Sequence, residues 1–320
     1  MPAMGRCFLF LMDPVETIDI DGDSTFVLML EAQARGHEVL YAHPRLLRQH
    51  RDVPWIRAQP IELRREKGNH FTLGEAREVR LADCDAVFMR KDPPFDGNFL
   101  TQTYILDRVD RSKTVMVNDP QGIRDFNEKL SALRWPELMP ETMVAADRAS
   151  LKKFIEEHGE AVVKPLDGAG GAGIVHLKAG DKNIGSILDM LTLEGKRHIE
   201  AQAYLRDVVK GDKRVILLDG EPIGAINRIP AADDIRANMH VGGRAEKVGL
   251  TKRDEEIAAS LGPELKKRGL LFVGIDVIDG HLTEVNVTSP TGLQEANRFD
   301  GVKLEALIID AVEAKRDALG

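Results

Sequence analysis

Cysteine and long apolar runs are both scarce in this sequence of 320 residues. Its two cysteines, Cys7 and Cys84, lie inside apolar runs, which indicates buried thiols in a reducing compartment rather than a disulfide. No apolar run approaches the roughly 18 residues that a membrane-spanning helix needs, and the Cys7–Met12 run is too short for the core of a signal peptide. We therefore expect a cytoplasmic protein without a membrane partner.

An excess of charge of one sign is also missing. The formal net charge is −8, with acidic and basic residues interspersed, which argues against a nucleic-acid-binding surface. What the chain does have is a 43% share of hydrophobic residues, enough to bury a large core in two or three domains. We divide it into an N-terminal domain at 1–121, a small lid domain at 122–200 and a C-terminal domain at 201–320.

The N-terminal part alternates between strand and helix patterns. Strands are expected near 6–12 and at 38–42, 86–90 and 114–118, and helices at 24–35 and around 98–109. Gly36 provides a stop after the first helix. The alternation predicts an α/β domain with a mostly parallel sheet, and ligands of such sheets bind beyond the carboxyl ends of the strands.

Two basic residues, Arg90 and Lys91, lie at one such strand end, and Pro93-Pro94 then forces an extended turn. This position suits an anionic substrate. A surface charge pair would give the same pattern, so these residues alone leave both interpretations open.

Residues 161–173 have the sequence Ala-Val-Val-Lys-Pro-Leu-Asp-Gly-Ala-Gly-Gly-Ala-Gly. An apolar, β-branched run presents Lys164 and then opens into a glycine-rich loop. Glycine adopts positive φ and has no side chain, so such a loop can bring backbone N–H groups against phosphate oxygens. The chain continues with a strand-like pattern at 174–177, and we therefore predict that the loop joins two antiparallel strands.

Two well-known phosphate-binding patterns do not fit this loop. Gly168, Gly170 and Gly173 match G-x-G-x-x-G, but that dinucleotide fingerprint needs a helix after the third glycine. The Walker pattern fails because no Lys-Ser or Lys-Thr follows the glycines. On these residues alone, a glycine-rich hairpin without a ligand remains open.

A second informative segment covers residues 271–290. Residues 271–278 predict a buried strand and 282–287 the returning strand of a hairpin. Glu284 and Asn286 alternate with valines on the return strand, so both point to one face. Their oxygens are hard ligands of the kind that Mg²⁺ prefers, although a solvated polar strand face would show the same pattern.

Five phrases along the chain resemble the ATP-grasp superfamily and, within it, the bacterial glutathione synthetases. They occur in that family's order at residues 89–96, 127–130, 164–168, 211–215 and 284–291. The Arg-Lys-Asp-Pro-Pro and Asn-Val-Thr-Ser-Pro-Thr phrases within them are particular to glutathione synthetases. Residues 48–80 and the tail after Thr291 match poorly.

The resemblance implies an activity and a fold. The activity is the ligation of γ-glutamylcysteine to glycine through an acyl phosphate, with ATP as co-substrate and Mg²⁺ or Mn²⁺ as the metal. The fold combines an N-terminal parallel-sheet α/β domain with α+β lid and C-terminal ATP-grasp domains. We also expect a homo-oligomer.

The resemblance further implies residue roles. Nucleotide binding falls to Lys129, Lys164, Gly168, Gly170, Gly171, Gln202, Leu205 and Asp212. Arg228 is implied to face the acyl phosphate as the catalytic group. Substrate binding falls to Arg90, Asp92 and Ser289, and metal binding to Asp276, Glu284 and Asn286. Lys129 is expected on a helix that includes Asn127 and Glu128, and neither cysteine is assigned to catalysis.

The hairpin turn decides whether Asp276 can join the metal face. Asp279-Gly280 is a strong signal for a two-residue turn, which would leave Asp276 opposite Thr283. A three-residue connection at 279–281 would instead pair Asp276 with Glu284. Since the metal site requires the second pairing, we predict the three-residue connection.

Two alternative functions remain open. One is another ATP-grasp carboxylate–amine ligase, such as a D-alanine–D-alanine or amino-acid ligase, against which only segments 90–94 and 288–291 speak. The other is a non-catalytic nucleotide-binding protein of the same fold. Residues 229–244, rich in Gly, Ala, Asn and Asp, predict a mobile loop that is either a closing lid or an ordinary surface loop.

Overall fold

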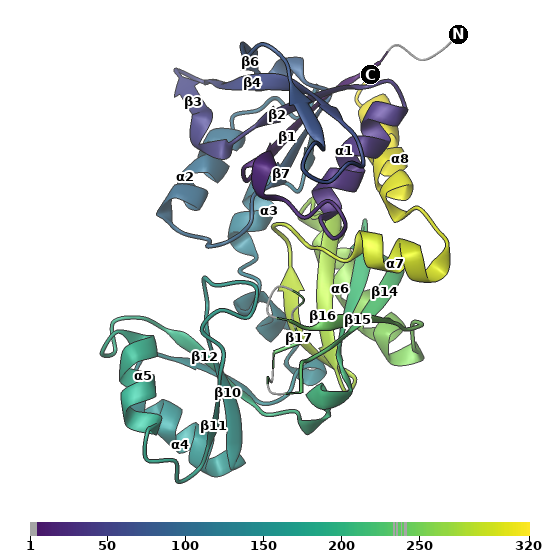
Figure 1. Cartoon of the computed structure of the whole chain (residues 1–320). Coiled ribbons are helices and arrows are strands. Elements are labelled where there is room, and N and C mark those ends of the chain that lie inside the picture. Colours follow the sequence, from purple (N-terminus) through teal and green to yellow (C-terminus); the bar gives the residue numbers. More distant parts are fainter. Residues whose placement is uncertain (1–4, 233, 235, 238, 240–241) are drawn as a thin grey trace.

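The computed structural model describes residues 5–232, 234, 236–237, 239 and 242–320. Three β-sheets organise the chain, and Figure 1 shows the N-terminal sheet at the top, the lid at the lower left and the C-terminal sheet beside it. Short 3-10 helices lie between the main elements: η1 (Val15–Thr17), η2 (Pro44–Leu46), η3 (Leu81–Asp83), η4 (Leu130–Arg134), η5 (Pro136–Leu138) and η6 (Arg206–Lys210).

The N-terminal sheet has a parallel centre and an antiparallel extension. The parallel strands are β2 (Glu38–Ala42), β1 (Cys7–Met12), β7 (Ala86–Arg90) and β8 (Val115–Val117), as the alternating pattern predicts. The antiparallel strands are β3 (Leu47–His50), β4 (Val53–Leu63), β5 (Phe71–Leu73) and β6 (Arg77–Arg80). The expectation of a mostly parallel sheet therefore holds only for the centre, because residues 47–80 add four antiparallel strands.

Three helices accompany this sheet: α1 (Ser24–Ala34), α2 (Gly97–Leu106) and α3 (Pro120–Asp125). Helix α1 begins where the Asp23 side chain accepts a hydrogen bond from the Phe26 N–H, which satisfies a free helical donor. It ends before Gly36, whose φ of +83° is left-handed, so the predicted glycine stop is confirmed.

The lid is a four-stranded antiparallel sheet with two helices. Its strand order is β11-β10-β12-β9, from β11 (Val175–Lys178), β10 (Glu160–Pro165), β12 (Ile199–Ala203) and β9 (Thr142–Ala145). Helices α4 (Arg148–His158) and α5 (Ile184–Thr192) bury their apolar faces against it. The glycine loop joins antiparallel β10 and β11, which confirms that prediction.

The C-terminal sheet is antiparallel in the order β15-β14-β13-β16-β17. Its elements are β13 (Asp212–Leu218), β14 (Glu221–Ile229), β15 (Arg244–Lys247), β16 (Phe272–Ile278), β17 (His281–Asn286) and helix α6 (Lys252–Lys267). Helices α7 (Leu293–Asp300) and α8 (Leu304–Asp317) then return to the N-terminal domain, where α8 lies against α1 (Figure 1). Arg35 ties the two helices through ion pairs of 2.6 Å to Asp310 and 2.8 Å to Glu313.

The boundaries at 121/122 and 200/201 remain a proposal. The first boundary separates the N-terminal sheet from the lid sheet. The second falls inside strand β12 of the lid sheet, which continues to Ala203. The predicted loop at 229–244 begins at the end of β14 and includes residues 233, 235, 238, 240 and 241, which lie outside the described residues.

The hairpin turn differs from the prediction. Ile278 pairs with His281, so the connection is the two-residue Asp279-Gly280. Both turn residues have positive φ, 49° and 71°, as this tight turn type requires. The prediction of a three-residue connection was wrong, because Asp279-Gly280 forms the two-residue turn that this dipeptide favours.

The pairing of Asp276 with Glu284, which motivated that prediction, is nevertheless present. The strand register shifts by one residue between Val277 and Asp276. Asp276 therefore pairs with Glu284, and Thr283 is an extra residue on β17. This is a β-bulge, and the Thr283 hydroxyl donates to the Asp276 carbonyl oxygen at 3.2 Å. The bulge turns Asp276 to the face of Glu284 despite the two-residue turn.

Candidate active site

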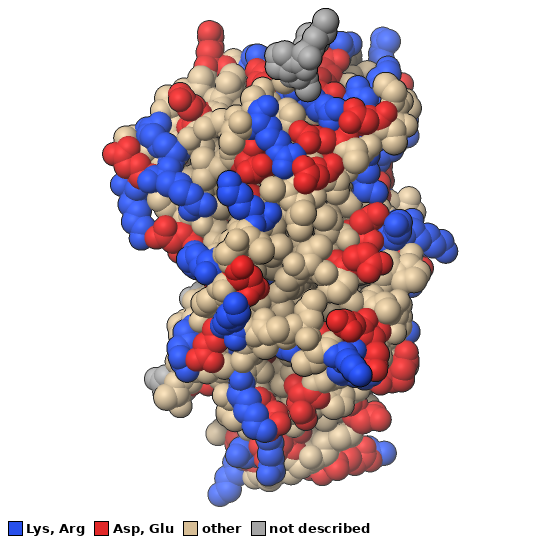
Figure 2. Space-filling model, turned by 90° about the vertical axis from the view of Figure 1, so that its right-hand side faces the viewer, with Lys and Arg blue, Asp and Glu red and all other residues tan. Residues whose placement is uncertain are grey.

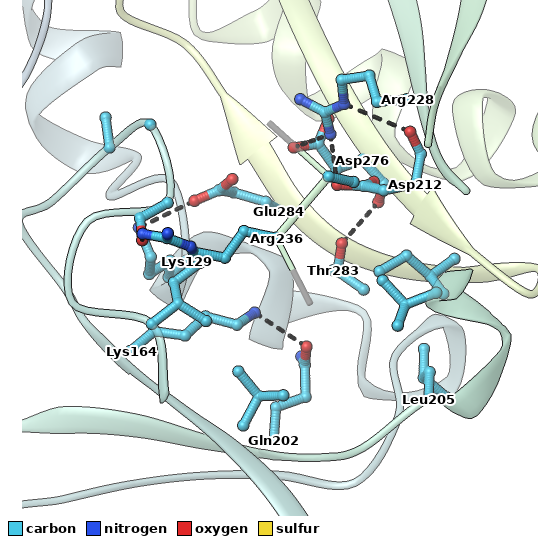
Figure 3. A pocket seen from close by; sticks show the side chains of 18 of the residues that line it. Lys129, Lys164, Gln202, Leu205, Asp212, Arg228, Arg236, Asp276, Thr283 and Glu284 are labelled. Carbon is cyan, nitrogen blue, oxygen red and sulfur yellow. Dashed lines mark hydrogen bonds and ion pairs between the residues drawn. The ribbon is translucent and has the colours of Figure 1, made fainter. Parts of the chain in front are cut away.

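A cavity lies between the lid and the C-terminal sheet (Figure 3). Every residue that the sequence analysis assigned to the nucleotide, the metal or catalysis lines it: Lys129, Lys164, Gly168, Gly170, Gly171, Gln202, Leu205, Asp212, Arg228, Asp276, Glu284 and Asn286. We call it the first cavity. These residues come from distant parts of the sequence, and the fold brings them together.

Lys164 reaches the first cavity from β10. Its ammonium nitrogen lies 2.9 Å from Glu200 Oε1 and donates to Gln202 Oε1 at 3.0 Å, both from the paired strand β12. Glu200 is fully buried, and Lys164 is its ion-pair partner among the described residues. In the adjoining loop Gly170, Gly171 and Gly173 have φ between 67° and 82°, a conformation that favours glycine.

Lys129 is not on a helix, contrary to the prediction. The Asn127 side-chain oxygen accepts hydrogen bonds from the N–H groups of Lys129 and Leu130, which replaces helical bonding with a local turn. The lysine lies 2.9 Å from Glu284 Oε1 and donates to the Gly168 carbonyl at 2.8 Å. Burial alone would lower the pKa of Lys129, but the Glu284 carboxylate raises it above its usual value.

An alternating network of arginines and aspartates forms the wall opposite the lid. Asp276 lies 2.5 Å from Arg214 Nε. It also lies 2.9 Å from Arg228 Nη2, and Arg228 lies 2.6 Å from Asp212 (Figure 3). Burial would raise the pKa of Asp276, but the two guanidinium groups hold it well below its usual range. Burial raises the pKa of Asp212 to about 6 despite the charge of Arg228.

The three expected metal ligands share one face of the β16–β17 hairpin. The Asn286 amide donates to Asp276 Oδ2 at 3.2 Å, and Glu284 is the direct cross-strand neighbour of Asp276. An all-oxygen donor set with two carboxylates fits Mg²⁺. Within the described residues no cluster of three His, Cys, Asp or Glu side chains could hold a metal, so the amide oxygen and phosphate oxygens would complete the coordination.

A second cavity lies between the N-terminal sheet and the segment after β17. The expected substrate residues Arg90, Asp92 and Ser289 line it. Arg214, in the wall of the first cavity, donates to the Thr291 carbonyl at 3.5 Å, and Thr291 lines the second. The two cavities therefore adjoin at Arg214.

Known proteins match this chain over nearly its whole length. A family model for the N-terminal domain of prokaryotic glutathione synthetase matches residues 7–124, and a model for the ATP-grasp domain of the same enzyme matches residues 128–301. The chain belongs to the prokaryotic glutathione synthetase family. As a member, it is an ATP-grasp ligase of glutathione biosynthesis.

Curated relatives agree with this family. The chain is 49% identical over 305 residues to the glutathione synthetase of Brucella melitensis, covering 95% of this chain and 97% of that one. It is 45% identical over 314 residues to the glutathione synthetase of Synechococcus elongatus, with coverage of 95% and 97%. Of the functions left open by the sequence, these matches favour glutathione synthetase over a D-alanine ligase or a non-catalytic protein.

Solved structures share the fold at low sequence identity. D-cycloserine synthetase DcsG has a TM-score of 0.67 at 17% identity, covering 98% of this chain and 100% of that one. The ATP-grasp ligase PsnB, complexed with minimal precursor, Mg and ADP, has a TM-score of 0.60 at 18% identity, with coverage of 97% and 98%. At such identities the likeness concerns the ATP-grasp fold alone.

Two arginines of the first cavity were missed by the sequence analysis. Arg214 lies within the 211–215 phrase of the glutathione synthetase resemblance, so the motif contained the signal although no role was assigned to it. Arg236 lies in the irregular 229–244 segment, where no local pattern marks it, and it pairs with Asp234 at 2.6 Å.

On the face in Figure 2, acidic and basic side chains of the described residues are intermixed. Among those residues no helix has both the length and the apolar character to cross a bilayer. Cys7 and Cys84 are free thiols whose sulfurs lie 3.8 Å apart, away from both cavities.

Proposed function

We propose that this ligase joins γ-glutamylcysteine to glycine, with ATP bound in the first cavity and the dipeptide in the second. The reaction would have two steps. The cysteinyl carboxylate takes the γ-phosphoryl group of ATP and ADP leaves. The amine of glycine then attacks the acyl carbon, a C–N bond forms, the C–O bond to phosphate breaks and the amine loses a proton.

The cations of the first cavity support phosphoryl transfer. Lys129, Lys164 and the glycine loop are all in its wall, where donors to phosphate oxygens are needed. Positive charge near the transferring group stabilises the charge that develops there. Asp276, Glu284 and Asn286 would hold Mg²⁺, which would supply positive charge to the phosphates when bound.

The remaining walls of the first cavity suit the rest of a nucleotide. Its apolar lining could enclose a flat base: Val162, Ile174, Leu205, Val208 and Ile278. Asp212 Oδ1 is buried without a hydrogen-bond partner among the described residues, which supports a polar contact with the bound ligand.

The junction of the cavities supports the acyl-phosphate step. Arg214 lines the first cavity and donates to the carbonyl of Thr291, which lines the second, and Arg228 shares Asp276 with it. Both guanidinium groups are buried, so water is scarce where a hydrolysable acyl phosphate would form. We assign Arg228 to the transferring group, as the sequence suggested, and add Arg214 as the residue nearer the peptide.

The adjacency of the two cavities at Arg214 is the observation that carries this proposal. Its test is quantification of ADP, phosphate and glutathione with γ-glutamylcysteine, glycine, ATP and Mg²⁺, and with each component omitted in turn. We expect all three products only in the complete mixture. Turnover with D-alanine and none with γ-glutamylcysteine would overturn the proposal.

A further inference from the structure

Glu128 is an acidic residue next to the first cavity but not in its wall. The sequence places it immediately before Lys129, which lines that cavity, but Glu128 itself is not among the described residues that line either cavity. It lines a small cleft formed also by Phe95 of the N-terminal domain, Leu166 of the loop after β10 and Thr288 after β17. Three distant parts of the chain therefore meet at Glu128.

The carboxylate of Glu128 collects three hydrogen bonds from the segment after β17. Its Oε1 accepts from the N–H groups of Val287 at 3.0 Å and Thr288 at 3.1 Å, and from the Thr288 hydroxyl at 2.8 Å. Successive N–H groups that converge on one point form a concave anion site, and here a side chain of the protein occupies it. The Glu128 carbonyl also accepts from the Val285 N–H at 2.8 Å. Thr288 is only 4% exposed, so the loss of this acceptor would leave its buried donors unpaired.

Val287 and Thr288 form the link between the two cavities. Asn286, immediately before the link, lines the first cavity, and Ser289, immediately after it, lines the second. A displacement of the link would therefore change the placement of the metal face relative to the peptide site.

The residues on either side of Glu128 bind the lid. Asn127 donates through Nδ2 to the Leu166 carbonyl at 2.9 Å, and Lys129 donates to the Gly168 carbonyl at 2.8 Å. Three consecutive residues thus hold the glycine loop, strand β17 and the link in one arrangement. Reacting atoms must lie roughly 3–3.5 Å apart and in line, so a small displacement of the link is enough to slow the reaction.

We propose that Glu128 is a positioning residue, which fixes the link so that the peptide carboxylate in the second cavity faces the transferring phosphoryl group of ATP in the first. The inference rests on the proposed function. Because Glu128 acts through the backbone of the link and not on a ligand, it should govern the rate rather than the affinities. When the link is displaced, the acyl phosphate is also poorly placed for glycine, and water can attack it to release phosphate and the free dipeptide.

Two substitutions separate the position of this carboxylate from its charge. Glu128→Gln keeps an acceptor oxygen at the same reach, whereas Glu128→Asp keeps the charge but withdraws the oxygens by one methylene, about 1.5 Å. With saturating substrates, kcat should fall about 100-fold in Glu128→Asp and less than about tenfold in Glu128→Gln. KM for ATP and for γ-glutamylcysteine should change less than about threefold in both variants. A role of the charge itself would reverse the order of the two variants and contradict the inference.

The ratio of products distinguishes misplacement from general damage to the protein. The wild-type enzyme and Glu128→Gln should release equal amounts of ADP and glutathione, whereas Glu128→Asp should release at least about twice as much ADP as glutathione. A merely destabilised protein would contain fewer active molecules, each with the normal ratio. An unchanged ratio in a slowed Glu128→Asp variant would therefore overturn the inference.

Glu137 provides the matched control, because it is an exposed acid of η5 in the same part of the sequence. Glu137→Asp and Glu137→Gln should keep the rate and the product ratio of the wild type. If the wild-type enzyme makes no glutathione, the proposed function fails. If it makes glutathione and Glu128→Asp does so at the full rate, only this inference fails.

Discussion

The two adjoining cavities differ in how their charges are balanced. In the first, each cationic side chain has an acidic partner within the protein: Lys129 with Glu284, Lys164 with Glu200, Arg214 and Arg228 with Asp276, and Arg236 with Asp234. In the second, Arg90 has no such partner among the described residues. Each cavity also has one buried carboxylate oxygen without a donor among the described residues, Asp212 Oδ1 in the first and Glu295 Oε2 in the second, so the difference lies in the cations.

The difference suggests two ways of receiving a ligand. On the proposed function, a nucleotide entering the first cavity would exchange partners, so that Lys129 and Lys164 turn from Glu284 and Glu200 to phosphates and Glu284 becomes free for a metal. A peptide entering the second cavity meets charges that are already fixed and unpaired, so little rearrangement is needed. The first site is therefore switched by its ligand, and the second is preorganised.

The largest effect should come from removing a phosphate cation of the first cavity. Lys164→Met should lower kcat by about 1000-fold, because a donor to the transferring phosphoryl group is lost. The melting temperature should stay near that of the wild type. Lys178→Met, an exposed lysine on the neighbouring strand β11, is the matched control and should keep full activity. Unchanged turnover in Lys164→Met would make this lysine structural.

A smaller but specific effect is expected for the metal face. Glu284→Gln should lower activity by about 100-fold at low Mg²⁺ and raise the Mg²⁺ concentration needed for half-maximal rate. The measurement is a Mg²⁺ titration of turnover at fixed ATP, with Glu221→Gln, an exposed residue of β14, as control. An unaltered Mg²⁺ requirement would remove Glu284 from the metal site.

The proposed exchange of Lys164 from Glu200 to the phosphates of ATP can be tested by changing Glu200. In Glu200→Gln the buried Lys164 ammonium loses its anion, so the ligand-free protein should unfold several degrees lower. Phosphates would restore a partner, and ATP should therefore raise the melting temperature of this variant more than that of the wild type. Equal ATP-induced shifts in thermal unfolding would contradict the exchange of partners.

The smallest effect concerns the pH dependence of stability. Burial raises the pKa of Asp212 from 3.8 to about 6. Between these two pH values the folded protein keeps a proton on Asp212 that the unfolded chain has already released. Its contribution to stability is full below the unfolded pKa and is lost as pH rises through about 6. The stability of Asp212→Asn relative to the wild type should therefore increase from pH 4 to pH 6 in urea unfolding without ligands. A difference independent of pH would show that Asp212 stays ionised.

Much of the first cavity could be predicted from the sequence, because the recognised motifs contain the residues that line it. The glycine loop, the position of Lys164 and the shared face of Glu284 and Asn286 follow from local rules. The position of Asp276 does not, since it depends on a bulge at Thr283 that a two-residue turn gives no reason to expect. Only the cross-strand register reveals it.

The second cavity was less accessible to sequence reasoning. Arg90 was identified by its strand end and motif. Glu295 lies after Thr291, where the sequence analysis found little resemblance although the family model extends to residue 301, and its neighbours Gly22 and Asp19 are distant in the sequence. Contacts across more than 250 residues, such as that between Leu293 and Ser24, assemble this cavity. No local pattern records such contacts.

The preorganisation of the second cavity is tested most directly by calorimetric titration of γ-glutamylcysteine into the nucleotide-free enzyme. We predict that the dipeptide binds without ATP, that Lys164→Met does not change its affinity and that Arg90→Met weakens it at least about tenfold. A wild-type enzyme that binds the dipeptide only after nucleotide is added would contradict the account.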